Sequence, residues 1–127
     1  MSKKNITNQA YGQKKKVSEH MIEQHLVNEV KKQGGWAPKF VSPGTNGMPD
    51  RIVLMPGGNL AFVELKAPGE KPRPLQVYRH QQLRDLGFQV FVMDDFDQTQ
   101  MIIDAIRGDA IRGDMSRRRD KEKKDDK

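Results

Sequence analysis

Apolar residues recur at helical spacing near the start of the chain. Ile22, Leu26 and Val30 follow one another at intervals of four, so all three share one face of a helix. Ser18 precedes this run with a side chain suited to capping a helix, and a Gly-Gly pair ends the run. The pattern predicts a first helix over residues 17–33.

Two apolar runs follow, separated by a turn. Residues 51–55 and 60–66 favour β-strands, and the Pro-Gly-Gly-Asn sequence at 56–59 favours a turn between them. The two runs therefore predict an antiparallel hairpin. Upstream of it, residues 36–41 are compatible with a further short strand, and residues 42–48 have the composition of a turn-rich loop.

The second half of the chain alternates helical and extended patterns. A helix is predicted over residues 75–86, with Pro74 in or just before its first turn and Gly87 at its end. A third strand is predicted over residues 88–93, and a last helix over residues 97–106. The order describes an α/β domain: a small mixed β-sheet flanked by helices, with Trp36 expected in its core.

Length and composition support one domain with charged ends. A chain of 127 residues suits a single compact domain. We predict a flexible arm over residues 1–16, the folded domain over residues 17–107, and a charged, disordered tail over residues 108–127. The chain has no cysteine, which excludes disulfides and thiolate chemistry. Its apolar runs are shorter than a membrane span, so we expect a cytoplasmic protein.

The net charge indicates a partner class. Lys and Arg number 23 against 17 Asp and Glu, a formal net charge of +6. A basic surplus favours a polyanion such as nucleic acid, because binding to phosphates releases counterions. A merely solvated basic tail would give the same total.

Three chemically active side chains converge if the hairpin forms. Successive side chains of a strand point to opposite faces, so Glu64 and Lys66 share one face at the end of the second strand. Asp50 follows Pro49 at the start of the first strand, and a turn at residues 56–59 brings that start beside Glu64. A Glu-x-Lys pair alone is more often a solvated strand edge. With Asp50 beside it, the pattern predicts a site.

The predicted cluster combines hard oxygen ligands with an ammonium group. Asp50 and Glu64 are the kind of ligands that Mg²⁺ and Mn²⁺ prefer. A bound metal acidifies its water and stabilises charge on a phosphate. Lys66 would hold the attacking water or neutralise the charge that develops on the phosphate. The chemistry predicted is phosphodiester hydrolysis.

The first helix offers an additional acid. At about 100° per residue, Glu19 and Glu23 fall within the arc that carries the apolar residues. Burying an unpaired charge is costly, so an inward acid needs a partner or a metal. Alternatively, both lie in the first turns, where the helix dipole tolerates acids. Glu19 and Glu23 are rivals for a third metal ligand.

The motifs resemble those of a nuclease family. The sequence Gly47-Met48-Pro49-Asp50-Arg51, followed by Phe62-Val63-Glu64-Leu65-Lys66, is similar to the motifs of the PD-(D/E)xK nucleases, in particular to the virus-type replication–repair nuclease domain, VRR-NUC. That family has a Ser-Glu on its first helix, a Gly-x-Pro-Asp, a Glu-x-Lys and a downstream Gln. The matching residues here are Glu19, Asp50, Glu64, Lys66 and Gln76.

The resemblance implies a fold and a function. It implies a restriction-endonuclease-like core, Mg²⁺ or Mn²⁺ as cofactor, and Glu19 rather than Glu23 as the acid near the metal. It also implies a structure-selective DNA endonuclease that resembles Holliday junction resolvases, commonly a homodimer, acting in phage replication, recombination or repair inside a bacterial host cell. The alternatives are a sequence-specific restriction-type nuclease and a non-catalytic DNA-binding module.

Some polar residues remain open to more than one role. Gln76 is expected at the active site by the resemblance, but an ordinary glutamine at a helix start is nearly as good an interpretation. Four further cations are candidate phosphate contacts, although a solvated surface is the commoner role for each of them taken singly: Lys39, Lys71, Arg73 and Arg79. The three histidines show no spacing typical of metal ligands.

Overall fold

The computed structural model describes residues 16–108, and it confirms the predicted order of elements. The predicted arm and tail lie, apart from Lys16 and Gly108, outside the described residues. The elements are α2 (Glu19–Lys32), β1 (Arg51–Met55), β2 (Asn59–Leu65), α3 (Pro74–Asp85), β3 (Val90–Met93), a short 3-10 helix (Phe96–Gln98) and α4 (Thr99–Arg107).

The sheet is three-stranded and mixed, in the order β1-β2-β3. β1 and β2 form the predicted antiparallel hairpin, with Arg51 opposite Val63. β2 and β3 run parallel, with Leu65 beside Met93, and α3 lies between them in sequence. Residues 36–41 make only isolated bridges to β1, from Trp36 and Lys39, rather than a continuous strand.

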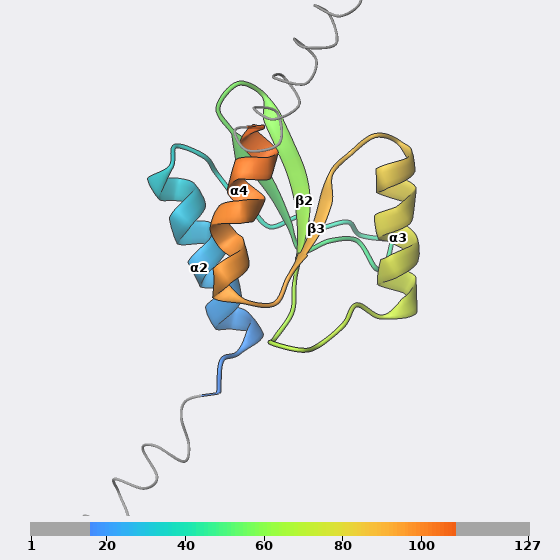
Figure 1. Cartoon of the computed structure of the whole chain (residues 1–127). Coiled ribbons are helices and arrows are strands. Elements are labelled where there is room, and N and C mark those ends of the chain that lie inside the picture. Colours follow the sequence, from blue (N-terminus) through green and yellow to red (C-terminus); the bar gives the residue numbers. More distant parts are fainter. Residues whose placement is uncertain (1–15, 109–127) are drawn as a thin grey trace, which may run out of the picture.

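The helices cover both faces of the sheet. α2 and α4 lie side by side against one face, and α3 lies on the other side (Figure 1). Ser18 caps α2 as predicted, because its hydroxyl accepts a hydrogen bond from the Met21 N–H at 3.1 Å. The last helix differs from the prediction in its first turn: Phe96–Gln98 is a 3-10 helix, and the α-helix begins at Thr99.

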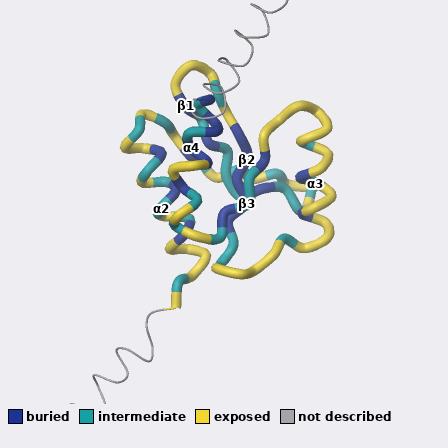
Figure 2. Tube along the Cα trace, in the orientation of Figure 1, coloured by how far each residue is buried: buried dark blue, intermediate teal, exposed yellow. Residues whose placement is uncertain are grey.

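The apolar core lies between the sheet and the α2–α4 pair. It is built from one face of α2, of α4 and of the three strands, and it lies within the dark central region of Figure 2. Its main members are Ile22, Leu26, Val30, Val53, Met55, Ala61, Val63, Leu65, Met93, Ile102, Ile103 and Ile106. The alternation predicted for β2 is therefore confirmed, since Ala61, Val63 and Leu65 all point into this core.

The opposite face of the sheet is different in character. Phe62 contacts Phe40 and Phe88, with ring centroids 5.5 Å and 5.9 Å apart. Next to Phe62 along the same face comes a buried carboxylate, Glu64, under α3. The face under α3 thus combines aromatic packing with buried polar groups, and this asymmetry positions the site.

Two further observations concern the surface. Trp36 is 66% exposed, so the expectation that it lies in the core is wrong. Its segment pairs with the edge of β1 through backbone bonds, and the sheet edge offers the indole no covering layer. No helix within residues 16–108 is long and apolar enough to cross a membrane.

Candidate active site

Asp50 lies where the hairpin brings it beside the end of β2. The register that pairs Arg51 with Val63 places Asp50 opposite Glu64 when it is continued by one residue. The Leu65 N–H donates a hydrogen bond of 2.9 Å to Asp50 Oδ2. The backbone carbonyl of Asp50 accepts a further hydrogen bond, from the Phe40 N–H at 2.8 Å. The predicted approach of Asp50 to Glu64 is thus present.

Glu64 is a buried carboxylate with polar neighbours. Its side chain is 1% exposed. Gln76 Nε2 donates to Glu64 Oε2 at 2.8 Å, and Lys66 Nζ lies 3.6 Å from the same oxygen. His80 Nε2 lies 3.6 Å from the other oxygen, Oε1. A solvated strand edge is therefore excluded for Glu64, because a buried charge requires such partners.

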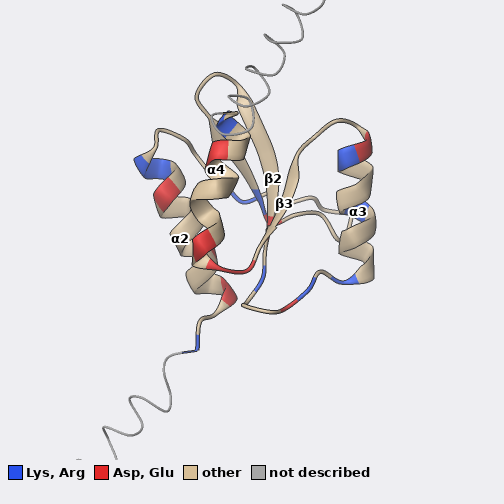
Figure 3. Cartoon of the chain, in the orientation of Figure 1, with Lys and Arg blue, Asp and Glu red and all other residues tan. Residues whose placement is uncertain are grey.

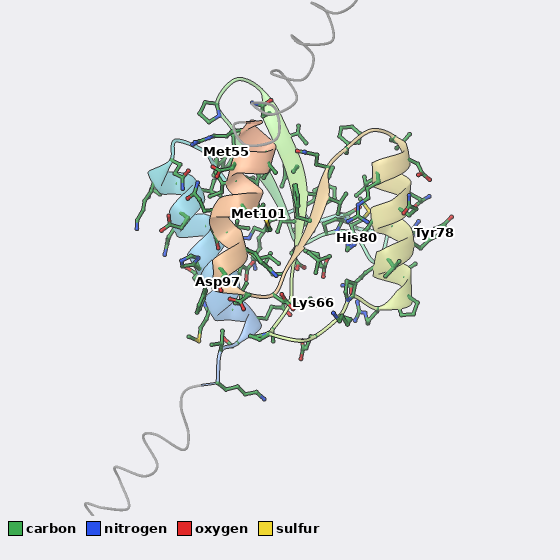
Figure 4. The ribbon with its side chains drawn as sticks, viewed as in Figure 1. Met55, Lys66, Tyr78, His80, Asp97 and Met101 are labelled. Atoms are coloured by element: carbon green, nitrogen blue, oxygen red, sulfur yellow. The ribbon has the colours of Figure 1, made fainter. Side chains whose placement is uncertain are left out.

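Lys66 projects from the end of β2 beside these acids. Its backbone N–H donates to the Met93 carbonyl at 2.9 Å, which continues the pairing with β3 by one residue. Its side chain is 13% exposed and lies at the end of the sheet (Figure 4). The structure thus brings together Asp50, Glu64 and Lys66, as the strand pattern predicted, and adds Gln76, which the resemblance implied.

The loop that leads into Asp50 packs against α3. Gly47 has φ +86°, and a Cβ there would lie 2.8 Å from Leu75 Cγ, so this position requires glycine for both conformation and space. Arg79 Nε donates to the carbonyl of Asn46 at 2.9 Å. Arg79, predicted to contact phosphate, therefore also anchors this loop to α3.

Asp50 has an unusual electrostatic environment. Its pKa is raised from 3.8 to about 6, chiefly by burial. The hydrogen bond from Leu65 N–H acts against this rise, whereas the negative charges of Glu64, Glu19 and Glu23 contribute to it. A nearby group of like charge destabilises the ionised form of a carboxylate. The site thus concentrates negative charge that a cation would relieve.

The two acids of α2 differ in their partners. Glu23 Oε2 accepts a hydrogen bond of 2.9 Å from Arg51 Nε, in an ion pair whose side chains are 17% and 12% exposed. The ion pair links α2 to β1. Arg51 also donates to the Ala37 carbonyl at 2.7 Å. Glu19 is exposed and close enough to raise the pKa of Asp50. Both acids line the cavity beside Asp50, and Glu23 is the one engaged by Arg51.

A cavity opens beside Asp50. It has a volume of about 250 Å³ and includes both acids of α2 in its walls. It is lined by Glu19, Glu23, Lys39, Phe40, Val41, Met48, Pro49 and Asp50. Glu64 is not among these residues, because it lies buried under α3. A ligand in this cavity would meet Asp50 directly, and Lys39 contributes a basic side chain to the wall.

The other predicted cations are placed around the site in different ways. Lys71 and Arg73 are exposed on the loop between β2 and α3 (Figure 3). The Arg73 backbone N–H donates to Gln76 Oε1 at 2.8 Å and thereby fixes the Gln76 amide. Lys39 is also exposed, on the bridge to Arg51. All three side chains are thus accessible to a phosphate group from solvent.

The donor set fits a hard divalent cation. No three His, Asp or Glu side chains within residues 16–108 are grouped closely enough to form a complete metal cage. Mg²⁺ does not require one, since it keeps several waters and is bound by one or two carboxylates with substrate phosphate. Asp50 supplies a carboxylate beside other negative charges, and Glu64 Oε1 is buried without a hydrogen-bond partner. The residues present therefore fit a hard divalent cation such as Mg²⁺.

The different partners of the two α2 acids give a prediction. Glu19→Gln is expected to lose most cleavage activity and to keep or slightly raise the melting temperature, because it relieves repulsion on Asp50. Glu23→Gln is the matched control: it weakens the pair with Arg51, and we expect the free energy of unfolding to fall by about 1–2 kcal/mol. Thermal denaturation and cleavage rates per folded molecule test both. Exchanged phenotypes would assign the metal-proximal role to Glu23.

Sequence reasoning did not identify Arg51 and His80. Arg51 begins an otherwise apolar strand, and a charge at such a position signals a buried partner. His80 follows Gln76 by one helical turn, so the two share a face of α3. The spacing of the histidines relative to one another does not indicate this relation to Gln76.

Comparisons with known proteins bear on the whole fold. No family model matches the chain. The chain is 54% identical over 86 residues to a protein named "Putative nuclease p44" from Acyrthosiphon pisum secondary endosymbiont phage 1, and the match covers 68% of this chain and 92% of that relative. A solved structure described as "VRR_NUC domain" matches with a TM-score of 0.64 and 32% sequence identity, covering 68% of this chain and 94% of the other.

The chain belongs to the VRR-NUC domain family. The mixed three-stranded sheet with helices on both faces is therefore a VRR-NUC nuclease fold. The TM-score is high enough to carry the assignment of the fold, and the two identities extend it to the family. The predicted α/β class and the resemblance to a phage nuclease domain are both confirmed.

Proposed function

We propose that this VRR-NUC domain is a metal-dependent endodeoxyribonuclease of the PD-(D/E)xK class, selective for branched DNA. The main supporting observation is that Asp50, Glu64 and Lys66 lie together at one end of the sheet. Lys66 Nζ is 3.6 Å from Glu64 Oε2, and the Leu65 N–H donates a hydrogen bond to Asp50 Oδ2. Membership of a nuclease family supports the same reading.

The side chains divide the chemistry among them. Asp50 and Glu64 would hold Mg²⁺ or Mn²⁺, and Glu19 is the acid placed to join them. A bound metal supplies an acidified water and charge stabilisation at the phosphate. Lys66 places an ammonium beside Glu64, where it can orient the attacking water and neutralise charge on the pentacoordinate phosphorus of the transition state. Gln76 fixes the orientation of Glu64 through its hydrogen bond.

The cations around the site would bind the DNA backbone. Lys39 lines the cavity next to Asp50, while Lys71 and Arg73 stand on the loop that follows Lys66. Backbone contacts of this kind position a nucleic acid without reading its sequence. This arrangement suits recognition of DNA shape and favours a structure-selective enzyme over a restriction-type nuclease.

The biological setting and the oligomeric state are inferred from the family. We place the enzyme in phage replication, recombination or repair, in the bacterial cytoplasm, because the similar protein belongs to a phage. A homodimer would present two active sites to the opposed strands of a four-way junction. The dimer and the junction preference stay predictions.

Cleavage assays test the proposal. The purified chain should nick branched DNA faster than linear duplex in Mg²⁺ or Mn²⁺, and EDTA should abolish nicking. Ca²⁺ is expected to support binding with little cleavage, because its loose coordination positions water poorly. Full activity in EDTA would end the metal hypothesis. Binding without cleavage in any metal would favour a non-catalytic DNA-binding module. Cutting of linear duplex at one particular sequence, as fast as branched DNA is cut, would favour a restriction-type enzyme.

A further inference from the structure

Helix α3 has an inverted distribution of side chains. A helix that packs on a sheet normally buries an apolar stripe. The buried residues of α3 are instead Gln76 and His80, both polar and one turn apart. Three of its large apolar side chains, Leu75, Val77 and Tyr78, are exposed. Figure 4 shows His80 on the side of the helix that faces the sheet and Tyr78 on the outer side.

Both buried residues of α3 face the same carboxylate. Gln76 donates to Glu64 Oε2 at 2.8 Å. Its amide orientation is fixed, because its Oε1 accepts the Arg73 N–H at 2.8 Å. Glu64 Oε2 is thus held by α3 through a short network that ends on the backbone. The second oxygen, Oε1, has a different neighbour.

His80 lies beside Glu64 Oε1 in the interior. Its side chain is 2% exposed, and Nε2 is 3.6 Å from Oε1. Neither atom has a hydrogen-bond partner. A hydrogen bond requires about 2.7–3.2 Å between such atoms, so a shift of a few tenths of an ångström completes one. Leaving both atoms unpaired is costly in a buried site, which favours that shift.

We propose that His80 is a positioning residue that fixes the Glu64 carboxylate for metal binding by donating a hydrogen bond from Nε2–H to Oε1. Together with Gln76 it gives each oxygen of Glu64 one donor from α3, which sets the plane of the carboxylate. Each oxygen keeps a further lone pair for a cation. Partners that orient metal ligands in this way tune metal affinity. The inference rests on the proposed function and adds a supporting residue to it.

Two replacements of His80 separate positioning from packing. His80→Leu removes the donor and keeps an apolar filling of the site. His80→Gln keeps an amide donor at the reach of Nε2. We expect His80→Leu to weaken Mn²⁺ binding, measured by calorimetry without DNA, by about tenfold or more. We expect His80→Gln to restore affinity to within about threefold of wild type. Tyr78→Leu, on the outer face of the same helix, should leave Mn²⁺ affinity unchanged.

Cleavage kinetics provide a second test of the role of His80. His80→Leu should lower kcat at limiting Mn²⁺ and leave KM for DNA unchanged, whereas lost packing would lower the melting temperature and the folded fraction alone. If His80→Leu does not fold, His80→Met takes its place. The proposal is overturned if the apolar variant binds Mn²⁺ as wild type does, or if a folded His80→Gln is as defective as the apolar variant.

The same experiment keeps the two proposals distinguishable. A wild-type chain that binds Mn²⁺ but cuts no DNA contradicts the nuclease function, and the calorimetric comparison still decides the role of His80. A wild-type chain that cuts DNA while the His80 variants bind Mn²⁺ normally contradicts only the positioning role. A wild-type chain that binds no Mn²⁺ and cuts no DNA contradicts both.

Discussion

Asp50→Asn is expected to lose cleavage by on the order of a thousandfold and, in the absence of metal, to melt at a higher temperature than wild type at pH 8. The loss follows because an amide is a poor ligand for a divalent cation. The gain follows because Asp50 is half-buried next to Glu64, Glu19 and Glu23, which raises its pKa to about 6. Asparagine still accepts the hydrogen bond from the Leu65 N–H.

The pH dependence of this gain has a defined sign. Between the unfolded pKa of 3.8 and the folded pKa of about 6, the folded protein holds its proton more tightly than the unfolded chain does. Stability contributed by Asp50 therefore falls as pH rises through this window. The melting temperatures of Asp50→Asn and wild type in EDTA should converge near pH 4 and separate by pH 7. An advantage that does not change with pH would contradict this environment for Asp50.

Lys66→Ala is expected to lower the cleavage rate by about a hundredfold to a thousandfold with little change in DNA binding. The reason is that the ammonium acts on charge that develops during the reaction, next to Glu64. Single-turnover cleavage and equilibrium binding measured on the same junction would separate the two effects.

Lys71→Ala is the matched control for Lys66→Ala. Lys71 is exposed on the next loop, and its loss should weaken binding and reduce the salt dependence by about one phosphate contact. A Lys66→Ala enzyme with near-normal turnover would remove Lys66 from the catalytic group. A Lys66→Ala enzyme that only binds more weakly would assign it to the backbone contacts.

The convergence of the site was predictable because a hairpin has few degrees of freedom. The turn at residues 56–59 and the alternation along β2 are sufficient to place Asp50 near Glu64 and Lys66 on paper. This relation follows from one strand pairing. Gln76 was expected at the site only through the family resemblance, and it is found hydrogen-bonded to Glu64.

What sequence reasoning missed depends on contacts between distant elements. The pair of Glu23 with Arg51 joins α2 to β1, and helical periodicity cannot reveal which acid finds a cation across the fold. The exposure of Trp36 follows from its place at a sheet edge, which its hydrophobicity does not indicate. The burial of His80 against Glu64 depends on how α3 docks, and its polar inner face carries no apolar periodicity from which to predict that docking.

The most direct test of the central claim is the position of Mn²⁺ in crystals of the chain, located by anomalous diffraction. We predict a peak bound by Asp50 and Glu64, with metal–oxygen distances of about 2.0–2.2 Å, that is lost in Asp50→Asn. The enzyme in the same Mn²⁺ concentration should cut branched DNA. A cleaving enzyme whose Mn²⁺ lies away from both carboxylates, or whose peak persists in Asp50→Asn, would contradict the account.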